Sequence, residues 1–400
     1  TNWITADVTL ANGAVINNRS DSNFNVAVAG KKLANIRGGT VTFNNEGTFT
    51  KNDGPGTATV AVAGGVDRFN FNNSGIVDVG AGTLIIGADP GPSTHTNTGS
   101  FQIASGATLV LGKSHILSTG SSFSGAGTVI FNGDGNTTNV VTANVDVTVE
   151  PNLNLGQFGQ LSGPGVVTVK GNLNLAGFMA GAKLTALGDV VINASTREIN
   201  SSILTLGDGA GPDAGSTTTW SAGDIYMRNP STINNRSDSV INTTANNSVG
   251  APNGGTFNNE GTFNQNGTLT TTFGAAMNNS GTINVNNGTF LFNGTYTQTA
   301  GALVLNGGNV SRGNSSNTFT VQGGKLQGGG TVTGGVTASG GTIHIEPGIG
   351  TTPGALTITG DLTLTSGSKL SFDIGGTTAG TQHDKVTESA GSTTSVAGVV

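Results

Sequence analysis

The side chains of this sequence best suited to acid–base or metal chemistry are four histidines: His95, His115, His344 and His383. None has a second His close by in the sequence, and the chain contains 0 Cys. Metal centres and nucleophilic sites need several such groups converging on one point. His344 alternates with Ile343 and Ile345, which predicts a solvent-facing place on a strand. We therefore expect no catalytic, cofactor-binding or metal site at the histidines.

Carboxylates could cleave or bind sugars if two of them stood about 5–10 Å apart on one face of neighbouring elements. The candidates lie in turns rich in Gly: Asp134, Asp146, Asp208, Asp213 and Asp224. Trp220 and Tyr226 lie near Asp224, but no Arg, Lys or further aromatic residues gather around these acids. We expect them to be turn residues and the protein not to be an enzyme. A carbohydrate-active protein is the alternative.

Two turns, 132–136 and 208–213, offer oxygen atoms of the kind that calcium prefers. Neither turn supplies the five or six clustered donors of a tight site, so we expect solvated turns, with bound calcium as the alternative. A separate charged motif, Asn-Arg-Ser-Asp, occurs at 18–21 and again at 235–238. It predicts a turn tied by an Arg19–Asp21 ion pair, with Arg236–Asp238 as its counterpart.

The recurrence of that motif belongs to a duplication of the whole sequence. Residues 1–22 align without a gap on residues 218–239, and the alignment pairs Trp3 with Trp220. The segment from Phe43 to Phe49 returns unchanged from Phe257 to Phe263. We therefore expect two repeat blocks, 1–217 and 218–400, continuous with each other, that superpose turn for turn with matching corners on the same edge.

The composition excludes several classes of protein. Only 10% of the 400 residues are charged and 5% are aromatic, whereas 67 are Gly. The net charge of −6 carries no cluster of Lys or Arg, so we expect neither nucleic acid nor an anionic membrane as partner. No apolar run approaches the roughly 18 residues of a membrane span. A signal peptide is also lacking, so we expect a mature secreted segment or part of a longer precursor.

Short alternating segments predict the structural elements that carry all these residues. Examples are 109–111, 145–149, 173–175 and 356–358, where apolar residues recur at every second position. Gly and Asn between the segments favour tight turns. Asn-Asn pairs recur at spacings of 20 to 28 residues. One turn of a parallel β-solenoid has this length, so we predict an all-β, right-handed parallel β-helix, an elongated rod with Asn ladders at its corners.

The C-terminal region resembles a family of bacterial surface proteins. The stretch IEPGIGTTPGALTITGDLTLTSGSKLSFDIGGTTAGTQHDKV at 345–386, together with residues 261–310 and GGKLQGGGTVTGGV at 323–336, is similar to the passenger repeats of autotransporters and of filamentous-haemagglutinin-like proteins. The resemblance implies a right-handed β-helix, export to the cell surface, and a role in adhesion, matrix or appendage building. It implies no active site.

Together these observations predict a non-enzymatic structural module of a secreted cell-surface fibre, adhesin or extracellular matrix protein. Both ends of the chain read as strand-like sequence without a polar cap, and uncapped strand edges favour pairing with another chain. We therefore expect the protein to associate with itself head to tail by strand addition, and other surface proteins or glycans are further possible partners. The alternative is a carbohydrate-binding or polysaccharide-degrading β-helix of tailspike or lyase type.

Overall fold

The computed structural model describes residues 1–27, 29–63, 67–88, 93–132, 138–193, 197–210, 215–244, 246–314, 316–340 and 343–397. These residues form strands, turns and bends without any helix, which confirms the all-β prediction. The described part of the chain therefore contains no helix that could span a membrane. The chain divides into two compact units. Unit 1 comprises Thr1–Val190 and Ser201–Ile203, and unit 2 comprises Val191–Asn200 and Leu204–Val400. The division at residue 217 that the sequence repeat suggests stays a prediction.

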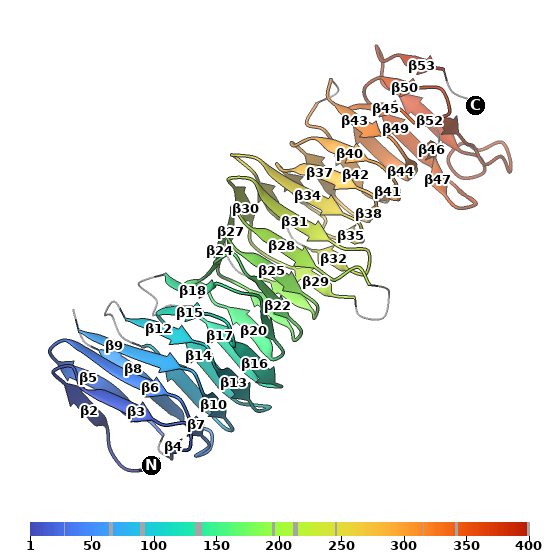
Figure 1. The fold of residues 1–400 in the computed structure, drawn as a ribbon. Helices are drawn as coiled ribbons and strands as arrows, with labels where there is room; N and C mark the ends of the chain where they lie inside the picture. The colour runs from blue at the N-terminus through green and yellow to red at the C-terminus, as the bar shows by residue number, and fades with distance from the viewer. Residues whose placement is uncertain are drawn as a thin grey trace. The chain divides into compact units, whose positions relative to one another are not determined.

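Strands in each unit cycle through three parallel sheets, called A, B and C here. Along most of the chain a strand pairs with the strands three places earlier and later, so that every turn of the chain contributes one strand to each sheet (Figure 1). Pairing between successive turns in register defines a parallel β-solenoid, as the spacing of the Asn pairs predicted.

Unit 1 contains the following strands. Sheet A consists of β1 (Asn2–Trp3), β4 (Asn23–Val26), β7 (Thr48–Lys51), β10 (Ile76–Val79), β13 (Ser100–Ile103), β16 (Ser122–Gly125), β19 (Val147–Val149), β22 (Val166–Val169) and β25 (Lys183–Ala186). Sheet B consists of β2 (Val8–Ala11), β5 (Lys32–Arg37), β8 (Thr57–Ala63), β11 (Thr83–Ile86), β14 (Thr108–Leu111), β17 (Thr128–Phe131), β20 (Asn152–Leu155) and β23 (Leu173–Leu175). Sheet C consists of β3 (Val15–Asn18), β6 (Thr40–Asn45), β9 (Arg68–Asn73), β12 (Thr94–Asn97), β15 (Ser114–Leu117), β18 (Asn139–Ala143), β21 (Gly159–Ser162) and β24 (Phe178–Ala180).

Unit 2 repeats the cycle, with β26 (Val190–Ile192) and β28 (Ile203–Leu206) at the boundary. Sheet A consists of β31 (Ser231–Asn235), β34 (Gly255–Asn259), β37 (Ala276–Asn279), β40 (Tyr296–Gln298), β43 (Thr318–Val321), β45 (Gly335–Ala338), β50 (Leu362–Leu364) and β53 (Thr394–Val396). Sheet B consists of β29 (Thr217–Trp220), β32 (Val240–Thr243), β35 (Thr262–Gln265), β38 (Thr282–Val285), β41 (Ala302–Asn306), β44 (Gly324–Thr333), β46 (Ile343–Glu346) and β51 (Lys369–Leu370). Sheet C consists of β27 (Arg197–Asn200), β30 (Ile225–Arg228), β33 (Ser248–Gly250), β36 (Thr270–Phe273), β39 (Thr289–Phe292), β42 (Asn309–Ser311), the end of β44, β49 (Ala355–Ile358) and β52 (Lys385–Glu388). The hairpin of β47 (Gly348–Ile349) and β48 (Thr352–Pro353) lies outside the three sheets.

Alternation along the strands builds the core. In β14, Leu109 and Leu111 are buried, whereas Thr108 and Val110 lie on the outer surface. Phenylalanines supply much of the interior. Phe24 and Phe49 stack with ring centroids 5.4 Å apart in unit 1, and Phe263 and Phe290 stack at 5.1 Å in unit 2. Because residues at the same place in successive turns lie about 4.8 Å apart, a few aromatic side chains form continuous stacks, and the low aromatic content suffices.

Matching corners of the sequence repeat lie in different sheets. Asn45 ends β6 in sheet C, whereas its sequence counterpart Asn259 ends β34 in sheet A. Trp3 likewise belongs to sheet A, and Trp220 to sheet B. The expectation that the corners share one edge and that the two tryptophans take equivalent places is therefore wrong. The duplicated segment runs through the solenoid one strand out of phase.

The two copies of the duplicated segment nevertheless make the same local hydrogen bond at their tryptophans. The indole N–H of Trp220 donates to the carbonyl of Gly223 at 2.8 Å, and that of Trp3 donates to the carbonyl of Ala6, again three residues on. Both indoles are buried, at 5% exposure for Trp3 and 2% for Trp220. The repeated sequence therefore specifies the local structure of a corner, and this corner occurs at different junctions between the sheets.

Candidate interaction surfaces

Buried Asn side chains close the corners between sheets C and A in unit 1. Asn18 donates from Nδ2 to Oδ1 of Asn45 at 2.7 Å, and Asn45 donates to Oδ1 of Asn73 at 2.8 Å. The second Nδ2 proton of Asn45 goes to the carbonyl of Ile76 at 2.9 Å. Backbone carbonyls at the corners lie where the chain passes from one sheet to the next. The Asn side chains donate hydrogen bonds to carbonyls that would otherwise lack a backbone partner. The predicted amide ladder is confirmed.

A second ladder runs along the outer surface in the opposite direction. Asn72 donates to Asn44 at 2.9 Å, and Asn44 donates to Asn17 at 2.8 Å, so each amide here donates toward the N-terminal turn. The buried ladder donates toward the C-terminal turn. At the first turn, Oδ1 of Asn18 in the buried ladder and Nδ2 of Asn17 in the outer ladder are therefore the atoms without a neighbour in their ladder.

Unit 2 builds the same two ladders at the corner between sheets A and B. The buried one runs from Asn235 to Asn259 to Asn279, with 2.7 Å at both steps. The outer one runs back from Asn278 to Asn258 at 3.0 Å and on to Asn234 at 2.9 Å.

Columns of Gly let the chain turn directly after these Asn pairs. A Cβ on Gly75 would lie 2.0 Å from the carbonyl oxygen of Gly47, and one on Gly281 would lie 2.1 Å from that of Gly261. Such distances lie far inside van der Waals contact, so any side chain here would push two turns apart. The Gly of each Asn-x-x-Gly or Asn-x-Gly corner is therefore required by the close approach of the preceding turn.

A buried Lys serves at one corner in place of an amide. Lys51 is fully buried at the end of β7, in register with the apolar Val26 and Val79 of the neighbouring turns. Its Nζ donates to the carbonyls of Gly54 and Ala81, each at 3.2 Å, and forms an ion pair with Asp53. This pair was not predicted, although Lys at an inward position of an alternating strand was a signal for it.

The Arg residues of the repeated Asn-Arg-Ser-Asp motif pair with the next turn. Arg236 Nη1 lies 3.0 Å from Glu260 Oε1, and Arg19 Nη1 lies 3.6 Å from Glu46 Oε2. Asp238 instead accepts the backbone N–H groups of Asp208 and Gly209, at 3.1 and 3.0 Å. The predicted Arg19–Asp21 and Arg236–Asp238 pairs are therefore wrong, because each Arg pairs instead with a Glu of the next turn of the solenoid.

The structure brings two of the four histidines together. His95 and His115 lie in register in β12 and β15, fully buried, with ring centroids 4.5 Å apart. His344 lies on the outer surface of β46, as predicted, with Nδ1 3.5 Å from Glu346 Oε1. His383 is in a loop, with Nδ1 3.1 Å from the carbonyl of Gly376. The His95–His115 contact was not predicted, although the separation of the two residues in the sequence equals one turn of the solenoid.

Each candidate carboxylate that the structure describes accepts a hydrogen bond from a backbone N–H group. Asp146 accepts from the N–H of Val166 at 2.8 Å, and Asp224 accepts from that of Ser248 at 2.9 Å. Asp208 accepts from the N–H of Ala210 at 2.7 Å. Asp134 and Asp213 lie outside the described residues, as does part of each of the two turns, 132–136 and 208–213, for which calcium was the alternative. Among the residues described, no three His, Asp or Glu side chains gather closely enough to hold a metal ion.

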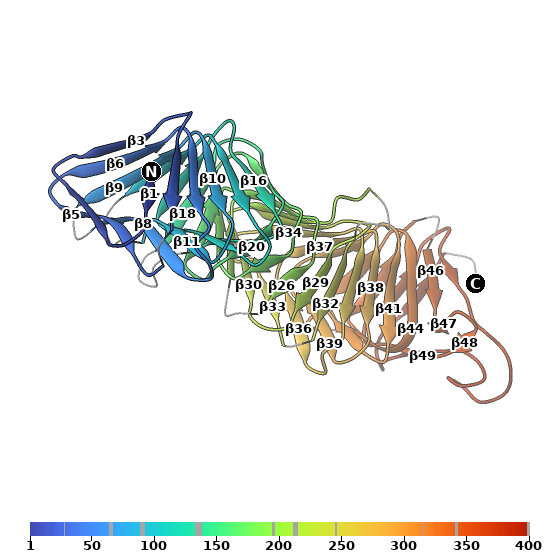
Figure 2. The ribbon, with the colours of Figure 1, turned by 90° about the horizontal axis from the view of Figure 1, so that it is seen from below.

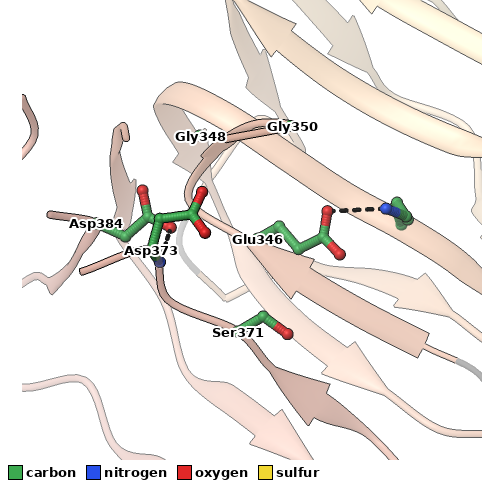
Figure 3. A pocket seen from close by; sticks show the side chains of 7 residues that line it. Glu346, Gly348, Gly350, Ser371, Asp373 and Asp384 are labelled. Atoms are coloured by element: carbon green, nitrogen blue, oxygen red, sulfur yellow. Dashed lines mark hydrogen bonds and ion pairs between the residues drawn. The ribbon is translucent and has the colours of Figure 1, made fainter. Parts of the chain in front are cut away.

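Two loops of unit 2, one with Gly348 and Gly350 and the other with Ser371, Asp373 and Asp384, line a cavity of about 180 Å³ (Figure 3). Asp384 accepts the N–H of Gly354 at 2.8 Å and that of Asp373 at 2.9 Å, which ties the loops together. Across the cavity Glu346 pairs with Lys325, with 3.0 Å between Oε2 and Nζ. Red loops beside β47 and β48 extend beyond the stacked strands in Figure 2. Ile374, in the segment between β51 and β52, is 85% exposed.

The terminal strands have one hydrogen-bonded neighbour each within the described part of the chain. In unit 1, β1 pairs with β4, β2 with β5, and β3 with β6. In unit 2, β51 pairs with β46, β52 with β49, and β53 with β50. Apolar side chains lie exposed at both edges, with Val15 of β3 57% and Val396 of β53 47% accessible.

Parallel turns in register, amide ladders and Gly columns define this chain as a β-solenoid repeat protein. No family model matches the chain, and neither does any curated protein or solved structure with which it was compared.

Proposed function

We propose that this protein is a non-enzymatic structural module of a secreted bacterial surface fibre, adhesin or extracellular matrix protein, and that copies join end to end by strand addition. The observation that carries the proposal is the pair of one-sided edges, β1 to β3 in unit 1 and β51 to β53 in unit 2. The resemblance of the C-terminal region to autotransporter and filamentous-haemagglutinin-like repeats supports secretion and a place at the cell surface.

Backbone chemistry supports the joining of the two edges. Each edge strand offers N–H and C=O groups, and a strand from a second copy satisfies them in the same way as the next turn of a solenoid. A polar group buried without a partner costs about 1–3 kcal/mol, so the contact is favourable only when the strands pair. The net charge of −6 over 400 residues opposes such contacts weakly at physiological salt.

Electron microscopy of edge variants tests the proposal. Val15→Lys places a charge on the outermost strand of sheet C, where it should block docking without affecting the core. Ile36→Lys is the matched control, because Ile36 is 63% exposed in β5, which already has neighbours on both sides. We expect filaments from the wild type and from Ile36→Lys, and isolated particles from Val15→Lys. Filaments of equal length from all three proteins would contradict the proposal.

A carbohydrate-binding or carbohydrate-degrading protein is the second candidate, and one outer face of unit 2 favours it. Tyr226 lies on the outside of sheet C, with its ring carbons within 2.9 Å of where a Cβ on Gly250 would stand. Beside it, Arg228 Nε pairs with Glu198 Oε2 at 3.1 Å. Aromatic rings and charged pairs bind sugars in many proteins, although this patch has a single aromatic ring. Binding on a glycan array that is lost in Tyr226→Ala would favour this candidate over the first.

A further inference from the structure

Two side chains replace backbone carbonyls between β9 and β12 of unit 1. Register pairing between these strands covers Asn72 with Thr96 and Asn73 with Asn97. Before those pairs, the N–H of Phe71 donates to Nδ1 of His95 at 3.0 Å, and the N–H of Phe69 donates to Oγ of Ser93 at 2.9 Å. The preceding junction, between β6 and β9, pairs in register over all six residues from Thr40 to Asn45. Side chains of β12 and the residue before it therefore hold this junction.

The hydrogen bonds assign the protons of the two imidazoles. Nδ1 of His95 accepts from Phe71, so its proton is on Nε2, which has no hydrogen-bond partner among the described residues. His115 donates from Nε2 to the carbonyl of Gly112 at 2.9 Å, and its Nδ1 lies 3.3 Å from Nδ2 of Asn97. Both rings are neutral in this arrangement, and both are fully buried.

A charge on either ring is unfavourable in these surroundings. Burial, and for His95 also the neighbouring His115, lowers the pKa of both imidazoles, that of His115 to about 4. Residue Val141 of the next turn lies in register with His115 and is apolar. The described charged residues on the adjoining elements are Asp67 and Arg68 at the start of β9 and Lys113 just before β15. None of them contributes to the lowered pKa of either histidine.

We propose that His95 and His115 form an acid-sensitive latch that holds β9 and β12 together in unit 1. When Nδ1 of His95 takes up a proton from solvent, the N–H of Phe71 loses its acceptor, and a positive charge stands beside His115. The two turns then separate locally, which exposes strand edges in the interior of unit 1. The described part of unit 2 contains no stacked pair of histidines, so it should stay closed at the same pH.

Hydrogen exchange of the full chain, measured by mass spectrometry, tests the latch. Protection factors are compared at pH 7 and pH 5 for segments 67–75 and 93–117, with 255–279 of unit 2 as the internal reference. The pKa of His115, which falls from 6.5 to about 4 on folding, by itself predicts about twentyfold lower protection at pH 5, and the lowered pKa of His95 adds to this loss. The reference segment should keep its protection. Equal protection of all segments at both pH values would overturn the proposal.

Two substitutions separate the latch from general acid sensitivity. His95→Asn places an amide oxygen near the position of Nδ1, so it accepts from Phe71 but does not titrate. Because only His115 still titrates, we expect a smaller loss of protection between pH 7 and pH 5 than in the wild type. His344→Asn on the outer surface of unit 2 is the control, and it should keep the wild-type response. If His95→Asn loses protection in acid as the wild type does, the proposal is wrong. If His95→Asn does not fold, the proposal is tested by the protection factors of the wild type and of His115→Gln at pH 7 and pH 5.

Discussion

Asn45 donates from Nδ2 to Oδ1 of Asn73 in the next turn of the solenoid, at 2.8 Å, and both side chains are buried. The same Nδ2 reaches the carbonyl of Ile76 at 2.9 Å. One side chain therefore joins its turn to the next in two places, at a corner where backbone pairing is interrupted. The stability of the solenoid should depend on these corners.

Asn45→Ala removes that corner link. The substitution removes one of the two acceptors of Asn18 Nδ2, which keeps the carbonyl of Thr48, and it removes the Asn45 donor from Oδ1 of Asn73 and from the carbonyl of Ile76. Because each buried polar group without a partner costs about 1–3 kcal/mol, we expect a loss of about 2–4 kcal/mol. Chemical denaturation measures the loss. Asn44→Ala, in the more exposed outer ladder, should cost less than about 1 kcal/mol, and equal losses would contradict the account.

Gly281→Ala should destabilise unit 2 by a steric effect. The new Cβ would lie 2.1 Å from the carbonyl oxygen of Gly261, so the two turns must move apart. We expect a loss of about 1–3 kcal/mol in chemical denaturation. Gly329→Ala is the control, because its nearest neighbours, at 3.4 Å, are at ordinary contact distance. A Gly281→Ala protein as stable as Gly329→Ala would show that the Gly columns are not needed for close stacking.

Lys51 and Asp53 should behave as one buried unit. Lys51→Met removes two hydrogen bonds to backbone carbonyls and leaves Asp53, whose side chain is 9% exposed, without its cation. Loss of one partner of a buried pair costs about 3–5 kcal/mol. The double variant Lys51→Met/Asp53→Asn should cost clearly less than the sum of the single changes. A double-mutant cycle in chemical denaturation measures this, and additive costs would argue against coupling.

Acid should destabilise the protein through His115. Its pKa is lowered by burial from 6.5 to about 4 in the folded state, so the unfolded chain binds a proton more readily. The stabilisation is complete above pH 6.5 and is lost as the pH falls toward 4, by up to about 3 kcal/mol. Denaturation midpoints measured from pH 7.5 to 4.5 should show this decline, and His115→Gln should reduce it to the part that His95 contributes. A wild-type midpoint that does not change over this range would contradict the assignment.

The sequence predicted the strands and the ladders because both depend on local pattern. Alternation such as that of Leu109 and Leu111 determines which side chains face the core, and the Asn pairs mark the ends of strands. Contacts between turns were harder to predict. His95 and His115, and also Arg19 and Glu46, lie one turn apart in the sequence and meet in space. Searching for charged and titratable residues separated by one turn would have found both pairs.

The phase of the repeat could not be read from the sequence. Asn45 and Asn259 stand in identical heptapeptides, yet they end strands of different sheets. The corner is stabilised by an amide ladder and a Gly column, and neither depends on which two sheets it joins. Which junction a corner occupies therefore depends on the number of strands before it, and strand lengths and loops of the intervening chain decide that number.

End-to-end joining of copies is the central claim, and sedimentation velocity of the intact chain over a wide range of concentrations tests it most directly. The account predicts species larger than the monomer that grow with concentration and persist at high salt, because the contacts are backbone hydrogen bonds rather than ion pairs. Val15→Lys and Val396→Lys, at the two opposite edges, should each remain monomeric. A wild-type chain that sediments as a monomer at every concentration would contradict the claim.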